Sequence, residues 1–225
     1  MAAPTDREEP KTVRIDVIFD SVCPWCYIGK RRLEKALALR PGLEPDITWR
    51  PFLLNPEMPP DGIDRATYLV RKFGSEARVR RVYGAIADAG QSEEIDFAFD
   101  SIRQTPNSVD SHRLVRFAGE AAGDAVEALF QAYFLSGADI GERDVLVGIG
   151  AGIGLEARAL RAYLESDADI DEVLAENARA HRLGINGVPA YVFDGGMVIS
   201  GAQDPAILAR VMDVAWAGAP RALAL

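Results

Sequence analysis

The sequence predicts an α/β protein in which one sheet is split by a long, all-helical insertion. Three patterns support this fold class. The first 55 residues fit a strand, a helix and a second strand, helical periodicity alone runs from about residue 64 to 184, and two strands and a helix follow. Neither the β-α-β segment nor the β-β-α segment can bury a sheet alone, so both ends of the chain must meet in one sheet.

The N-terminal segment contains a strand, a helix and a second strand in close succession. The first strand is expected at residues 12–20, where apolar and polar side chains alternate. The next helix begins with Cys23 at the N-cap and Pro24 at the first helical position, where a missing N–H group costs nothing. A second strand is expected at 46–54, and Pro51 indicates a sheet edge because proline cannot donate to a strand ladder.

The middle and the end of the chain differ in periodicity. Six stretches, the first of them 65–90, are amphipathic helical patterns with no strand between them. Strands at 190–193 and 197–199 then flank an Asp-Gly-Gly turn, and a final helix at 204–218 starts with Asp204 as its cap. The predicted organisation is a split domain of residues 12–62 and 185–219, a helical domain of residues 63–184, and a disordered N-terminal tail of residues 1–11.

The composition argues against several classes of protein. The chain has 225 residues and a net charge of −9, which argues against nonspecific binding to nucleic acid. No apolar run approaches the roughly 20 residues of a membrane span, and the polar N-terminus lacks a signal core. We therefore expect a cytoplasmic protein without a membrane partner. Two cysteines cannot form a disulfide scaffold, and in a reducing cytosol such a pair is typical of a catalytic or metal site.

Both cysteines of the chain lie in the motif Cys-Pro-Trp-Cys at residues 23–26. A cysteine at a helix N-terminus faces unsatisfied N–H groups and the positive end of the helix dipole, and both favour the thiolate. Cys23 is therefore predicted as the attacking thiol, and Cys26, one turn later, as the resolving thiol. Pro24 and Trp25 lie between them as candidate substrate contacts, although an exposed Trp25 with no role is an alternative.

Two other interpretations of the cysteine pair are weaker. A structural zinc site needs four ligands, and the chain offers no second pair, while His112 and His181 are isolated, so no metal is expected. A purely structural disulfide between Cys23 and Cys26 would close a very short loop and constrain little of the unfolded chain. A dithiol–disulfide redox centre is the remaining interpretation.

The segment "GINGVPAYVF" at 184–193 places Pro189 directly before a strand. A proline loop beside a β-α-β unit with Cys-x-x-Cys resembles the thioredoxin fold, in which a cis-proline loop faces the active-site cysteines. The resemblance implies that Pro189 belongs to the catalytic site with Cys23 and Cys26 and that the Val188–Pro189 bond is cis. It also implies that the Val188 backbone can pair with an extended substrate.

The whole pattern resembles the DsbA family, and most closely its FrnE-like branch, which is related to 2-hydroxychromene-2-carboxylate isomerases and kappa-class glutathione transferases. The motifs that carry the resemblance are "FDSVCPWCYIGKRRLEKAL", "PFLLNP", "NSVDSHRLVRFA" and "GINGVPAYVFDGGMVISGAQ". The family implies a thiol–disulfide oxidoreductase that acts on protein or small-molecule thiols and disulfides and requires no cofactor. Dimeric relatives imply a homodimer as one expected state.

The isomerase relatives imply alternatives. They replace the first cysteine by serine and use glutathione, whereas this chain keeps both cysteines. By resemblance, a glutathione pocket would use Asn55, the Val188 backbone, Gln203 and Asp204, although Asn55 also fits a turn and Asp204 a helix cap. A glutathione-dependent isomerase or transferase for aromatic or polyketide-like substrates is therefore one alternative, and a redox-sensing binding module is another. An additional C-terminal cysteine pair of some FrnE proteins is absent here.

Several residues near the motif have two interpretations. Asp20 is able to act in proton transfer, but a turn at the end of a strand is its commoner role. His112 is able to face the active site, but a structural or surface position is favoured. The cations Lys30, Arg31 and Arg32 are expected on a solvated helix face.

Overall fold

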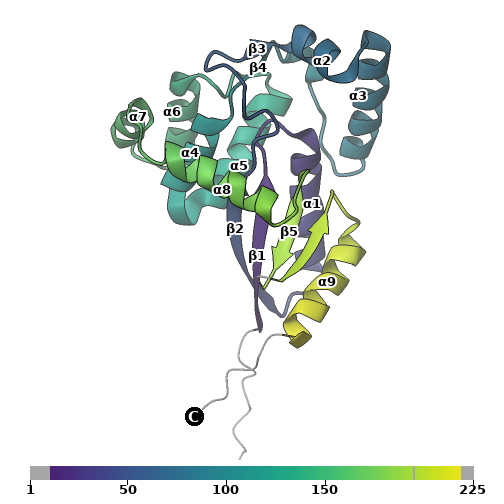
Figure 1. The fold of residues 1–225 in the computed structure, drawn as a ribbon. Helices are drawn as coiled ribbons and strands as arrows, with labels where there is room; N and C mark the ends of the chain where they lie inside the picture. Colours follow the sequence, from purple (N-terminus) through teal and green to yellow (C-terminus); the bar gives the residue numbers. More distant parts are fainter. Residues whose placement is uncertain (1–10, 195, 219–225) are drawn as a thin grey trace, which may run out of the picture.

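The computed structural model describes residues 11–194 and 196–218 and shows one central four-stranded sheet (Figure 1). Its strand order is β2-β1-β5-β6, with β1 parallel to β2 and antiparallel to β5. The two ends of the chain thus meet in one sheet, as predicted. The strands are β1 (Lys11–Phe19), β2 (Leu43–Pro51), β5 (Ala190–Phe193) and β6 (Met197–Ser200).

Local features of the predicted strands agree with the structure. Pro51 ends β2, which is an edge strand, so its missing N–H group is tolerated. The predicted hairpin joins β5 to β6, although Gly195 in its turn lies outside the described residues. Lys11 already belongs to β1, and the rest of the predicted tail is likewise not described.

Helices cover both faces of the sheet. On one face, α1 (Pro24–Ala38) and α9 (Pro205–Gly218) bury the alternating apolar side chains of β1. On the other face, α8 (Ile170–Arg182) packs near β2, where Ala180 joins Ile18 and Phe52 in an apolar cluster (Figure 1). This last helix of the predicted insertion therefore packs on the sheet and covers its second face.

The helical unit differs in two details from the sequence prediction. The stretch 65–90 is two helices, because Gly74 adopts φ +87° and Ser75 caps the second one. A short strand pair, β3 (Ile63–Asp64) with β4 (Gln104–Thr105), crosses the block that was expected to lack strands. The helices of this unit are α2 (Arg65–Phe73), α3 (Glu76–Gln91), α4 (Val109–Ala118), α5 (Ala122–Phe130), α6 (Arg143–Gly152) and α7 (Ala157–Glu165).

An aromatic core joins α1 to the helical unit. Tyr27 of α1 stacks on Phe130 at 5.0 Å between ring centroids, and α5 continues into a π-helical turn, Gln131–Leu135, that adds Phe134 to the same core. The end of β1 and the start of α1 therefore share a buried cluster with the helical insertion, next to the separate cluster that packs α1 and α9 on the sheet.

The cations of α1 correct the prediction of a solvated face. Lys30 is buried and pairs with Glu127 of α5 at 2.8 Å, and Arg31 contacts the same carboxylate at 2.5 Å. Arg32 pairs with the buried Glu93 at 2.7 Å. These cations are satisfied by acidic residues distant in sequence, so they hold α1 against the insertion.

Candidate active site

The two cysteines lie at the start of α1, directly after the turn that follows β1. Cys23 is the N-cap residue with an extended backbone (φ −97°, ψ 112°), and Pro24 opens the helix, which confirms the predicted cap. The Cys23 N–H donates to the Asp20 carbonyl at 3.0 Å, which fixes the turn between strand and helix. Both side chains are free thiols and both are buried, 5% exposed at Cys23 and 2% at Cys26.

The two thiols occupy different environments. Burial raises the pKa of the Cys26 thiol well above its usual value, and a hydrogen bond with Cys23 adds to the rise. Cys26 therefore holds its proton near neutral pH. Cys23 borders a cavity and lies at the helix end where unpaired N–H groups favour an anion. This difference is consistent with Cys23 as the attacking thiol next to the cavity and Cys26 as the more deeply buried resolving thiol.

The loop before β5 approaches the first cysteine. The peptide bond between Val188 and Pro189 is cis, as expected from the sequence. The Cys23 Sγ donates to the Val188 carbonyl at 3.7 Å. Gly29 on α1 permits this approach, because a Cβ there would lie 2.7 Å from Pro189 Cγ and 2.5 Å from the Tyr191 hydroxyl. The loop thus places a main-chain carbonyl beside the Cys23 thiol.

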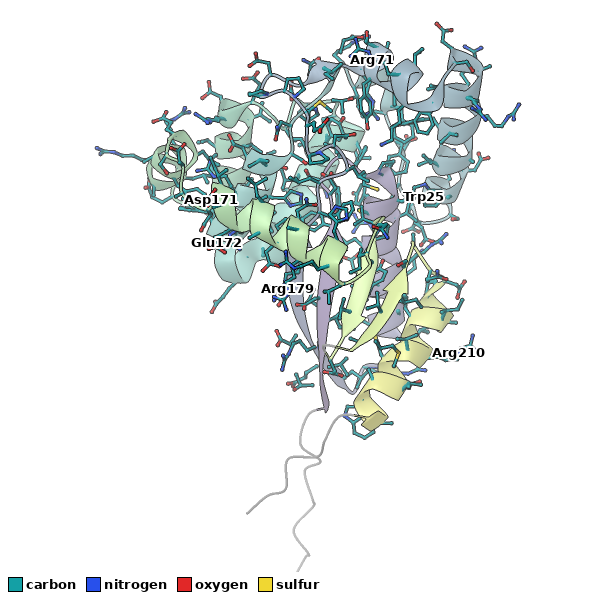
Figure 2. The ribbon with its side chains drawn as sticks, in the orientation of Figure 1. Trp25, Arg71, Asp171, Glu172, Arg179 and Arg210 are labelled. Atoms are coloured by element: carbon teal, nitrogen blue, oxygen red, sulfur yellow. The ribbon has the colours of Figure 1, made fainter. Side chains whose placement is uncertain are left out.

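A cavity of about 270 Å³ opens beside Cys23. Its charged lining residues are Arg65 and Lys72, both cations, and no carboxylate is among the described residues that line it. The chain as a whole carries 34 acidic residues against 25 basic ones, so this cavity has the opposite charge to the protein. Trp25, 37% exposed, also lines it, at the end of α1 that faces α2 and α3 (Figure 2). The apolar wall includes Val22, Leu54, Phe73, Val82, Ile86 and Val188.

Arg65 is a buried cation whose recorded partners are all neutral. Its guanidinium donates to the hydroxyls of Tyr83 at 2.7 Å, Tyr133 at 3.1 Å and Thr105 at 3.2 Å. It also lies over the rings of Tyr83 and Tyr133. Buried charges in proteins normally have a charged partner. A buried arginine that lines a cavity without one is suited to receive an anionic group.

The residues assigned to a glutathione pocket by resemblance are only partly brought together. Val188 lines the cavity beside Cys23, and Asn55 accepts a hydrogen bond at 2.8 Å from Tyr68, which also lines it. Gln203 and Asp204 are not among its lining residues. Gln203 donates to the Ser200 carbonyl at 2.7 Å, and Asp204 accepts from the Ala206 N–H at 2.8 Å, which makes Asp204 the cap of α9.

Asp20 and His112 lie together beside the turn that carries Cys23. The Asp20 carboxylate accepts hydrogen bonds from the N–H groups of Val22 at 3.3 Å and Leu54 at 2.8 Å, the turn role expected of it. His112 of α4 is buried rather than on the surface, and its Nε2 is 3.7 Å from Asp20 Oδ1. The helical unit therefore contributes a titratable side chain to this region.

Sequence reasoning missed Arg65, Lys72 and Tyr83 as parts of the site. In the sequence, Arg65 resembles Arg71, which is exposed at the outer edge of α2 (Figure 2). Only packing against β4 and α3 buries Arg65, so no local pattern distinguishes the two arginines.

The described residues show no sign of two other kinds of site. Within residues 11–194 and 196–218, no cluster of three or more His, Cys, Asp or Glu side chains is placed to bind a metal ion. None of the helices in this part of the chain combines the length and apolarity that crossing a bilayer requires.

The fold and the site together define the class of protein. A sheet completed by the two ends of the chain carries a Cys-x-x-Cys helix start that faces a cis-proline loop. Residues 14–213 match the family model of the DSBA-like thioredoxin domain. The match covers most of the chain, so the protein belongs to this family, which confirms both the predicted fold class and the predicted DsbA family.

Individual relatives are similar to this chain over most of its length. YwbO of Bacillus subtilis (strain 168) is 25% identical over 195 residues, covering 85% of this chain and 91% of YwbO. The crystal structure of the "probable DsbA oxidoreductase SCO1869" from Streptomyces coelicolor superposes with a TM-score of 0.85 at 29% identity, covering 95% of this chain and 94% of that one.

A more distant structure has the same fold. The cytosolic disulfide reductase DsbM from Pseudomonas aeruginosa, solved with GSH, has a TM-score of 0.65 at 16% identity, covering 89% of this chain and 98% of that one. At this identity the likeness shows the fold alone.

Proposed function

We propose that this protein is a thiol–disulfide oxidoreductase with Cys23 as nucleophile and Cys26 as resolving thiol. The observation that carries the proposal is the difference between the two thiols: Cys23 caps α1 beside a cavity, whereas Cys26 lies buried behind it. The family and the relative SCO1869 support the same chemistry.

The reaction is a pair of thiol–disulfide exchanges. In the reduced protein, the Cys23 thiolate attacks a substrate disulfide, so one substrate thiolate leaves and a mixed disulfide remains. Cys26 then loses its proton and attacks the Cys23 sulfur, which releases the second substrate thiolate and forms the Cys23–Cys26 disulfide. The two electrons pass from the protein to the substrate. The reverse sequence oxidises two substrate thiols, and the reduction potential decides the direction.

The substrate that fits the cavity best is a small thiol or disulfide with an anionic group. The cavity offers two cations and no carboxylate, and an arginine binds a carboxylate through two parallel hydrogen bonds. Its volume of about 270 Å³ suits part of a tripeptide-sized molecule rather than a folded protein surface. Glutathione has this chemistry, and the proposed anchor for its carboxylate is Arg65.

Cysteine variants test the catalytic assignment. Cys23→Ser should abolish exchange with glutathione disulfide, whereas Cys26→Ser should retain the first step and accumulate a mixed disulfide visible by mass spectrometry. If both variants turn over like the wild type, the assignment fails. If Cys26→Ser keeps a glutathione-dependent activity on the aromatic or polyketide-like substrates of the alternative, the isomerase or transferase function is favoured instead.

A matched pair of arginine variants tests the substrate class. Arg65→Gln removes the charge but keeps a hydrogen-bond donor, so we expect KM for glutathione disulfide to rise roughly ten-fold, about the worth of one charge-assisted hydrogen bond. The uncharged 2-hydroxyethyl disulfide should react unchanged. Arg71→Gln, on the exposed side of the same helix, is the control and should alter neither substrate. Equal losses with both disulfides would show that Arg65 is structural instead.

The direction of the reaction follows from one equilibrium measurement. The protein is equilibrated in glutathione buffers, and its disulfide is quantified by mass spectrometry. A potential near roughly −270 mV would make it a reductant, and one near roughly −120 to −180 mV an oxidant or isomerase.

A further inference from the structure

The Asp20–His112 pair is buried beside the active site, and Asp20 accepts two main-chain hydrogen bonds whereas the ring of His112 makes none within the described residues. Both side chains are inaccessible to solvent, and the closest recorded approach is 3.7 Å between His112 Nε2 and Asp20 Oδ1, suitable for an ion pair but long for a hydrogen bond. Among the residues that the structure describes, neither ring nitrogen of His112 has a hydrogen-bond partner. The ring packs edge-on against Phe19 at 4.9 Å between centroids.

A histidine at this place needs a physical reason. A buried polar group without a partner costs roughly 1–3 kcal/mol, and an apolar ring of similar shape would avoid that cost. His112 is a buried residue of α4. The hydroxyl of the adjacent Ser111 forms a hydrogen bond with the Ser21 hydroxyl at 2.6 Å, which joins α4 to the active-site turn. The imidazole is thus fixed beside Asp20 with its proton-binding nitrogens unused.

The resolving thiol, Cys26, requires a proton acceptor. Cys26 must give up a proton before it attacks the mixed disulfide, yet it is only 2% exposed, so bulk water at neutral pH is a poor proton acceptor for it. Its pKa is raised mainly by burial and then by Cys23; a backbone hydrogen bond of Asp20 opposes the rise, and the charge of Asp20 adds to it. Asp20 therefore interacts with both groups: its charge acts on the thiol that must lose a proton, and its carboxylate lies 3.7 Å from the His112 ring.

We propose that His112, acting through Asp20, takes up the proton of Cys26 when Cys26 resolves the mixed disulfide. The inference rests on the proposed thiol–disulfide exchange and adds a positioning residue from the helical insertion. Before the step, the proton is on Cys26. After it, the proton is on His112, and the imidazolium forms an ion pair with Asp20 at the observed 3.7 Å.

The step balances in atoms and electrons. The Cys26 S–H bond breaks and its proton passes to the pair, while the Cys26 sulfur forms a bond to the Cys23 sulfur. The bond between Cys23 and the substrate sulfur breaks, and the substrate thiolate leaves with that electron pair. The substrate disulfide is the oxidant of the complete reaction. The proton held on His112 is returned to solvent or to the departing thiolate.

Other titratable groups around the pair are engaged or face elsewhere. Arg113, next to His112, donates to Asp110 at 2.7 Å and to main-chain carbonyls after α7. From α5, the Glu127 carboxylate is held by Lys30. From β5, Tyr191 has a buried hydroxyl without a hydrogen-bond partner, and burial, followed by the charge of Cys26, raises its pKa above its usual range, so it keeps its proton.

The test uses His112→Phe in the full chain with glutathione disulfide as the probe. Phenylalanine keeps the ring packing against Phe19 and removes the proton acceptor. Reduced protein is mixed with glutathione disulfide, and samples are quenched in acid at successive times. Mass spectrometry of the samples measures the formation and the decay of the mixed disulfide separately. We expect formation unchanged and decay slowed roughly 100-fold, the low end for a positioned proton acceptor. Thermal stability should be equal or higher, because two unpartnered nitrogens are removed.

The matched control is His181→Phe. His181 also lies 4.9 Å from a phenylalanine ring, Phe52, but it is exposed on α8. Its variant should leave both steps unchanged. Raising the pH from about 7 to about 9 should largely restore decay in His112→Phe, since hydroxide then replaces the acceptor. If the substitution caused only a structural defect, decay of the mixed disulfide would stay slow at every pH.

The outcomes separate this inference from the proposed function. If the wild type forms no mixed disulfide, the proposed function fails. If it forms one and His112→Phe resolves it within about two-fold of the wild-type rate, only the role of His112 is overturned. If the phenylalanine variant does not fold, His112→Gln is tested in the same way, and a wild-type decay rate in that variant overturns the inference.

Discussion

Gly29→Ala tests how closely α1 must approach the cis-proline loop. In the middle of an exposed helix, glycine to alanine stabilises by about 1 kcal/mol. Here the added Cβ would lie 2.7 Å from Pro189 Cγ and 2.5 Å from the Tyr191 hydroxyl. The proline ring is rigid and Tyr191 is fully buried, so neither yields without moving its strand. Overpacking of this kind costs roughly 1–3 kcal/mol.

The steric cost should therefore exceed the gain in helix propensity. We expect a free energy of unfolding lower by about 1–2 kcal/mol, which for a chain of this size lowers Tm by roughly 2–8 °C. The rate of Cys23 with glutathione disulfide should also fall, because the loop that carries Val188 shifts relative to the Cys23 sulfur.

Urea and thermal unfolding, with exchange kinetics, measure both effects. Gly148→Ala is the control, since it is likewise the sixth residue of its helix, and a Cβ there would meet nothing within 4 Å. That variant should gain about 0.5–1 kcal/mol. The reasoning is refuted if Gly29→Ala gains stability as Gly148→Ala does.

Two further perturbations test buried charge. Burial opposes ionisation of Glu127, but its hydrogen bond to Lys30 and the charges of Lys30 and Arg31 hold its pKa below the usual value. A lowered folded pKa gives stability that is present above the unfolded pKa, about 4.3, and lost as pH falls through the folded value. Glu127→Gln should thus be less stable than wild type in urea at neutral pH, and the difference should shrink in acid; a constant difference contradicts this. Arg113 is fully buried and donates to Asp110 and several carbonyls, so Arg113→Lys should lose roughly 3 kcal/mol or more in the same assay; a loss below about 1 kcal/mol would contradict it.

Much of the catalytic motif was predictable because its signals are local. The N-cap position of Cys23 follows from a strand that ends just before it and a proline just after it. The β5–β6 hairpin and the cap at Asp204 likewise depend on residues within a few positions of each other. The β-α-β and β-β-α segments required each other because neither buries a sheet alone, which is why the meeting of both ends of the chain in one sheet could be predicted.

The sequence by itself determined where the two thiols lie along the chain and which segments build the sheet. Tertiary structure decided the surroundings of those thiols. Helical periodicity shows which face of a helix is apolar, but it does not show what covers the polar face. Lys30 and Arg31 were therefore expected in solvent, although they pair with Glu127, which is 96 residues from Arg31 in the sequence. Arg65 and His112 became parts of the site for the same reason: only packing between distant elements buries a charged or titratable side chain beside Cys23.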